Sequence, residues 1–172
     1  LGPVSFTAIR VALAALKGLN FAAQKPVVGL WSSEVSAHAT VLNQKPAAPA
    51  LCIVSDARKG ELYVTVFDVT GATPVTTLPP CILRPDELPA RLPDGLILFA
   101  GYDLPQFQSV ITQTLGDRAL FHPDPAYPDA ATTARLGEEK FRRQGRGDGV
   151  IEPVYLRQMQ FTKAQPPAIN PP

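Results

Sequence analysis

The sequence is poor in the residues from which most catalytic and metal-binding sites are built. Its 172 residues include two cysteines and two histidines, and neither pair has the spacing of a metal site. It contains no Ser-His-Asp signature, no His-Glu-x-x-His and no Gly-Lys-Ser/Thr phosphate loop. No apolar run approaches the roughly 20 residues that span a bilayer, and no signal-peptide pattern opens the chain. We therefore expect no metal ion, no cofactor and no membrane segment.

Charge is also nearly balanced. Sixteen basic and fifteen acidic residues give a net charge of +1, so a chain-wide electrostatic surface for nucleic acid is not expected. Cys52 sits in an apolar, strand-like run and is expected to be a small buried hydrophobe. A reduced, cytoplasmic setting follows most simply, although a single disulfide with Cys81 stays open.

Proline and hydrophobic residues are what the chain has in quantity. Nineteen prolines cluster in connections between elements. One connection is 45–50, which is the best linker candidate, and another is 78–80. In the segments between these connections, the periodicity of the apolar residues predicts an α/β protein. The expected helices are 5–23, 32–42, one starting at 84, 106–115 and 129–143; the expected strands are 27–30, 51–56, 61–68, 95–101 and 119–121, followed by an extended segment 153–157. Strands 51–56 and 61–68 are predicted to form a hairpin.

The first helix is apolar on almost every side. Its charges, Arg10 and Lys17, lie seven residues apart on one stripe. Phe6, Ile9, Leu13 and Leu16 form one apolar face, and Ala8, Ala12, Ala15 and Leu19 form another. One face can cover its own lobe, and the other then needs a second helix, which alanines allow to approach closely. The predicted partner-binding set is Ala8, Ile9, Arg10, Ala12, Leu13, Ala15, Leu16 and Lys17. The alternative is a helix buried in its own core.

Three further features have two interpretations each. The Gly-Pro turn at residues 2–3 is either a phosphate-binding helix start or a simple turn, and Val4 and Ala8 stand where phosphate loops favour glycine. The turn 56–61 offers carboxylates for metal or base chemistry, or is a solvated turn with a charge pair across the strands. A basic cluster either touches RNA or serves helix ends; its members are Arg135, Lys140, Arg142, Arg143, Arg146, Arg157 and Lys163. His38 and His122 have no ligand-spaced neighbours and are expected to be structural or exposed.

Three separated segments resemble one family. They are Gly-Pro-Val-Ser-Phe-Thr-Ala-Ile-Arg at 2–10, Asp-Ala-Arg-Lys-Gly-Glu-Leu-Tyr at 56–63 and Glu-Pro-Val-Tyr-Leu-Arg at 152–157. In this order they resemble the TsaB family, also called YeaZ. The positions that match its motifs are Gly2, Pro3, Ser5, Phe6, Thr7, Asp56, Arg58, Gly60, Glu61, Tyr63, Pro153, Tyr155 and Arg157. Val4 and Ala8 depart from the family, which has glycine there.

The resemblance implies an actin-like, ribonuclease-H-like fold of two lobes. The sequence starts on the Gly-Pro turn without an initiator Met, so we expect the first lobe to be incomplete and its opening strands to be absent. The expected division is 1–47 for the remainder of the first lobe, 48–157 for the second lobe with its hairpin at 51–68, and 158–172 for a proline-rich tail.

The resemblance also implies a function. TsaB-like chains are non-catalytic scaffolds that bind the catalytic subunit TsaD, with TsaE as an ATPase in the larger complex that transfers threonylcarbamoyl to an adenosine of tRNA. The helix matching 5–20 is part of the contact with TsaD in that family. TsaD-like chains carry a His-x-x-x-His metal pair, which this sequence lacks. Without its partner such a helix is expected to pair with a second copy.

An enzyme of the same fold, a small-molecule kinase or ATP hydrolase, is the alternative. Its second lobe would need a phosphate turn, for which Gly101-Tyr102-Asp103 is the one candidate. Direct contact with tRNA stays open.

Overall fold

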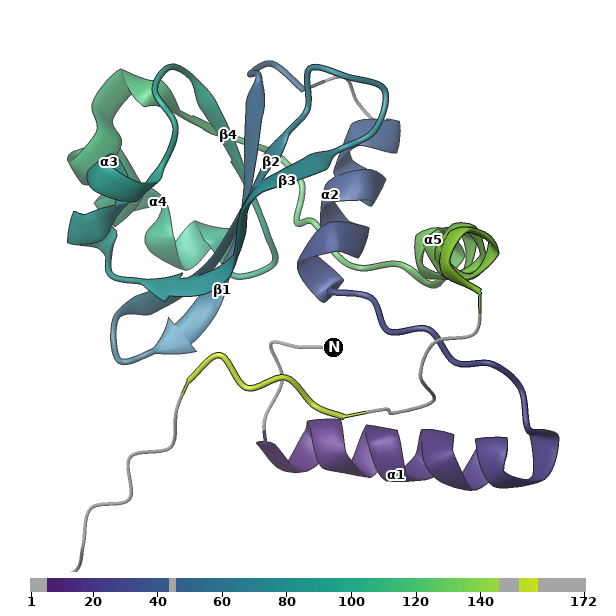
Figure 1. Cartoon of the computed structure of the whole chain (residues 1–172). Coiled ribbons are helices and arrows are strands. Elements are labelled where there is room, and N and C mark those ends of the chain that lie inside the picture. The colour runs from purple at the N-terminus through teal and green to yellow at the C-terminus, as the bar shows by residue number, and fades with distance from the viewer. Residues whose placement is uncertain (1–5, 44–45, 146–151, 158–172) are drawn as a thin grey trace, which may run out of the picture.

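The computed structural model describes residues 6–43, 46–145 and 152–157, where two helices precede three consecutive strands and the later strands alternate with helices (Figure 1). In chain order they are α1 (Phe6–Ala23), α2 (Ser32–Asn43), β1 (Ala50–Arg58), β2 (Glu61–Asp68), β3 (Val75–Leu83), the 3-10 helix η1 (Pro85–Glu87), α3 (Leu88–Arg91), β4 (Ile97–Ala100), α4 (Leu104–Leu115), the 3-10 helix η2 (Gly116–Arg118), β5 (Ala119–Phe121) and α5 (Ala130–Gln144). The α/β class is confirmed.

One five-stranded sheet, of order β3-β2-β1-β4-β5, organises the fold. β1 and β2 form the predicted antiparallel hairpin, in a register that places Leu51 opposite Phe67. β3 continues antiparallel beside β2, whereas β4 and β5 run parallel to β1. The parallel strands require crossover connections, and helices supply them.

Each face of the sheet has its own apolar core. Leu62, Val64 and Val66 of β2 point to the face covered by α3 and α4, as their alternation predicts. On the opposite face, Phe67 lies in a second cluster that includes Ala37 of α2. Figure 1 shows α3 and α4 on one side of the strands and α2 on the other.

α2 and α5 follow the sequence prediction closely. α5 begins where Asp129 accepts a hydrogen bond from the backbone N–H of Thr132 at 2.8 Å, which satisfies one of the free amides of its first turn. The predicted division puts α2 with the first lobe, yet α2 covers the sheet. The boundary at 47/48 itself stays a prediction.

The prediction that 78–80 is a connection was wrong. Pro79 and Pro80 lie inside β3, whose pairing with β2 shifts register between Val64 and Phe67. Proline cannot donate to a neighbouring strand and is tolerated at a sheet edge or a bulge. β3 is an edge strand, and both conditions are met there.

The predicted strand at 27–30 was also wrong. Between α1 and α2 the chain has no regular secondary structure. In the described part of the chain no strand lies alongside this segment, and a strand needs a paired neighbour. The segment 153–157 likewise joins no sheet. No helix within the described ranges is both long and apolar enough to cross a membrane.

Candidate interaction surface

α1 lies apart from the sheet and exposes most of its apolar surface. Figure 1 shows it below the sheet, with residues 152–157 between the two. Ile9 and Leu13, one helical turn apart, are buried, with 6% and 5% of their surfaces exposed. On other sides of the helix, Val11 is 63% exposed and Leu19 75%. One stripe of this helix therefore faces its own chain, and the rest faces solvent.

The outer face of α1, as we use the term, comprises Ala8, Val11, Ala12, Ala15, Leu19 and Ala22, all exposed. At 100° per residue these positions fall within one third of the helix circumference. The sequence placed Ala8, Ala12, Ala15 and Leu19 on this face. It missed Val11 and Ala22, although the same helical spacing identifies both.

The predicted partner-binding set is divided between two faces. Ala8, Ala12 and Ala15 lie on the outer face, whereas Ile9 and Leu13 point toward the sheet. Leu16 lines the side of the helix that faces the sheet and is 36% exposed, and Lys17 is exposed. Arg10 is exposed as well, and its Nε donates to the Tyr155 hydroxyl at 3.1 Å.

The structure brings parts of all three family-like segments together. Residues 152–157, which we call the closing strap, run between α1 and the hairpin. At one end Tyr155 accepts the hydrogen bond from Arg10 of α1. At the other, Arg157 Nη2 donates to the backbone carbonyl of Ala57 at 2.9 Å and forms an ion pair with Glu61. The sequence motifs identify these residues separately and do not predict the contacts between them.

The carboxylate of Asp56 stabilises the hairpin turn. Asp56 accepts the backbone N–H of Arg58 at 2.7 Å and pairs with that guanidinium at 3.0 Å. Lys59 and Gly60, the two residues between the paired Arg58 and Glu61, both have positive φ, as a tight two-residue hairpin turn requires. Arg58 also has positive φ, at the register shift between Asp56 and Arg58. The arrangement fits a solvated turn, but the charge pairs of the described residues do not join the two strands: Asp56 pairs with Arg58 of the same strand, and Glu61 pairs with Arg157 of the strap. No group of three potential metal ligands occurs in the described ranges.

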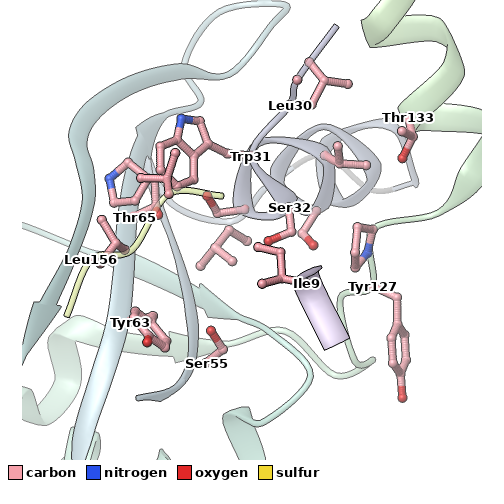
Figure 2. A pocket seen from close by; sticks show the side chains of 18 of the residues that line it. Ile9, Leu30, Trp31, Ser32, Ser55, Tyr63, Thr65, Tyr127, Thr133 and Leu156 are labelled. Atoms are coloured by element: carbon pink, nitrogen blue, oxygen red, sulfur yellow. The ribbon is translucent and has the colours of Figure 1, made fainter. Parts of the chain in front are cut away.

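A cavity of about 880 Å³ separates α1 from the sheet. Figure 2 shows Ile9 on one side, Trp31 and Ser32 at the start of α2, and Tyr63 and Thr65 of β2 on the sheet side. Its walls are mainly apolar and bring no catalytic constellation together. The cavity is the space over which the strap runs.

The predicted phosphate turn at 101–103 is a tight backbone crossing. Gly101 has φ +152°, and a Cβ there would lie 2.0 Å from the carbonyl oxygen of Val54. The carboxylate of Asp103 accepts the backbone N–H of Asp56 at 3.1 Å and so ties this turn to β1. A carboxylate at the turn repels a phosphate, since phosphate sites use donors and positive charge.

The arginines of α5 are paired along the helix. Arg135 and Arg143 both contact Glu139, and Arg142 contacts Glu138. Lys140 instead donates to the Gly29 carbonyl at 2.9 Å. Such i,i+4 pairs are typical of a solvated helix. Arg146 and Lys163 lie outside the described residues, as do Gly2, Pro3 and Ser5, and so does the side chain of Phe6.

Both cysteines are free thiols. Cys52 is fully buried in β1, and burial raises the pKa of its thiol because the thiolate loses its hydration. This agrees with the expected role as a small buried hydrophobe. His122 uses Nδ1 in contacts with the backbone of Asp124 and lies next to β5, away from any second histidine.

His38 of α2 faces α5 and is expected to make stability depend on pH. Desolvation lowers its pKa from 6.5, opposed by Glu34 and Glu139 and assisted by Arg135 and Arg143. The folded state thus keeps the ring neutral where the unfolded chain takes up a proton. The contribution is complete above pH 6.5 and is lost as pH falls below it. We expect urea midpoints of the wild type to fall between pH 7 and 5, and those of His38→Gln to fall less.

The first two thirds of the chain, roughly, match a known protein family. The family model described as TsaD, tRNA N6-adenosine threonylcarbamoyltransferase, matches residues 1–109. The match covers more than half of the chain. The chain belongs to the TsaD family. α1 and the hairpin lie inside the matched region, and the closing strap lies beyond it.

Two solved structures share the fold of this TsaD-family chain. One, from Pseudomonas aeruginosa, is described as an uncharacterized protein with similarity to the peptidase YeaZ; it is 22% identical, with a TM-score of 0.70 over 91% of this chain and 70% of its own. The other is YeaZ from Pseudomonas aeruginosa, 22% identical, with a TM-score of 0.65 over 83% of this chain and 64% of its own. Among curated proteins no match is found.

These likenesses confirm two predictions. The TsaB (YeaZ) resemblance seen in the three sequence segments is confirmed, and so is the actin-like, ribonuclease-H-like fold that it implies. Within the TsaD family, this chain is therefore TsaB-like.

Proposed function

We propose that this chain is a non-catalytic, TsaB-like subunit in the synthesis of threonylcarbamoyladenosine in tRNA, and that it binds a TsaD-like catalytic subunit through α1. The observation that carries the proposal is the outer face of α1, which is apolar and open to solvent. Membership of the TsaD family supports the pathway. The proposal places the chain in the cytoplasm, with its tRNA substrate, and needs no cofactor in this subunit.

The chemistry of the outer face favours a helix as the contacting element. Ala8, Ala12 and Ala15 recur at helical spacing and leave the backbone accessible. Val11 and Leu19 flank them as larger apolar side chains, and burying either contributes about 1.5 to 3 kcal/mol. At 100° per residue, Arg10 and Lys17 lie on the opposite side of the helix from the centre of this face, so the outer face itself is uncharged. A TsaE-like ATPase would join the pair as a third component.

Co-purification tests the proposal. The full-length protein and the TsaD of its organism are purified together and examined by size-exclusion chromatography with light scattering. We expect a stable heterodimer, and for the TsaB-like chain alone a mass that rises with concentration as α1 pairs with a second copy. A monomer that forms no complex and hydrolyses ATP by itself would contradict the proposal and favour a nucleotide-binding enzyme.

A further inference from the structure

The closing strap connects two elements that lie far apart in the sequence, α1 and β2. Arg10 of α1 and Glu61 of β2 are separated by 51 positions, and the strap contacts both. Between its two polar contacts, Leu156 lines the cavity with Tyr63 and Thr65 of β2 (Figure 2). The strap therefore spans the cavity from the helix to the hairpin.

The described part of α1 has little apolar anchorage on the sheet. Among the described residues, it contributes no side chain to either apolar cluster of the sheet. Its buried residues Ile9 and Leu13 line the cavity wall and are not interleaved with the core. A helix attached in this way opens at a lower free energy than the sheet, because few buried contacts must break.

We propose that Tyr155 and Arg157 are positioning residues, which fix the direction of α1 relative to the hairpin and so present its outer face to the partner. The proposal rests on the proposed function for the partner and on the strap contacts for the mechanism. Arg157 is suited to the role because one guanidinium nitrogen serves both the Ala57 carbonyl and the Glu61 carboxylate. Tyr155 accepts the hydrogen bond from Arg10 and so fixes α1 relative to the strap.

Hydrogen exchange of the protein alone tests the mechanism. In Arg157→Gln and in Tyr155→Phe, we expect the amides of residues 9–20 to exchange about five-fold faster, the effect of losing one charged or polar contact, which is partly buried at Arg157 and exposed at Tyr155. Amides of β1, β2 and β4 should keep their rates. The matched control is Arg143→Gln, which removes another arginine ion pair, that with Glu139 within α5.

Three further readouts separate positioning from simple loss of packing. The double variant Arg157→Gln with Tyr155→Phe should exchange no faster than the single variants, since either change already releases the strap. Exchanging the charges, with Glu61→Arg and Arg157→Glu together, should return exchange toward the wild-type rate. Trp31, the single tryptophan, lines the cavity, and its emission should shift to the red when the strap is released.

Unchanged exchange in α1, or equal acceleration across the whole sheet, would overturn the mechanism. Binding to TsaD is measured in the same variants, and we expect at least a five-fold weaker affinity although the outer face is intact. Wild-type affinity in a variant whose α1 exchanges faster would overturn the link to the partner. If wild-type protein bound no TsaD, the proposed function would fail while the exchange data still decided the role of the strap.

Discussion

Gly101→Ala is expected to yield little folded protein. The new Cβ would lie 2.0 Å from the Val54 carbonyl oxygen and 3.1 Å from its carbon, which are backbone atoms of the central strand β1. They cannot retreat without disturbing the pairing of β1, in which Val54 lies opposite Val64 of β2. Overpacking adds about 1 to 3 kcal/mol to a backbone strain of similar size, against a total stability of about 5 to 15 kcal/mol. Soluble yield and urea unfolding followed by circular dichroism measure the loss.

Gly95→Ala is the control that separates the steric clash of an added Cβ from the strain of a positive φ. Gly95 also has positive φ, +87°, but no atom lies within 4 Å of an added Cβ. This variant should lose about 1 kcal/mol or somewhat more, from strain alone. Equal losses in the two variants would show that the approach to Val54 is not what requires glycine at position 101.

Ala12→Arg should abolish binding to the TsaD-like partner while the sheet stays folded. Ala12 lies on the outer face, where a long charged side chain prevents the approach of a second helix and would be buried without a partner charge. We expect affinity to fall at least about 100-fold, in the range of disrupted interface centres. Titration calorimetry measures the affinity, and circular dichroism confirms the fold.

Ala14→Arg is the matched control for this experiment. It makes the same substitution in the same helix at an exposed position, about 160° away from Ala12 around the axis. Binding should remain near the wild-type value. Retained complex formation by Ala12→Arg, or equal loss in both variants, would argue against the outer face as the contact.

Local patterns predicted much of the fold. Alternation in 61–68 gave both the strand and its two faces, because Leu62 and Phe67 do enter opposite clusters. The apolar run at 27–30 looked equally strand-like, but an apolar run does not show whether a neighbour is there to pair with. β3 was missed for the opposite reason, since its prolines argue against a strand wherever the strand is not at an edge.

The candidate site was predicted in its residues but not in its contacts. Helical spacing identified the apolar circumference of α1, and it left open which stripe its own chain would cover. The ion pair of Arg157 with Glu61 joins residues 96 positions apart, a distance at which a single sequence has no local signal. Only the three-dimensional arrangement shows that Arg10 and Tyr155 belong to one unit.

The prolines of β3 have a consequence for how copies of this chain associate. A free sheet edge invites another chain to add a strand, and repeated addition grows into fibres. Here one edge carries Pro79 and Pro80, and the other is the short strand β5. If copies pair through α1, as proposed, contact between identical faces of two helices closes on itself as a two-fold pair, and neither sheet edge extends it. Growth stops at two molecules, so a crowded solution of this protein is expected to hold pairs and no filaments.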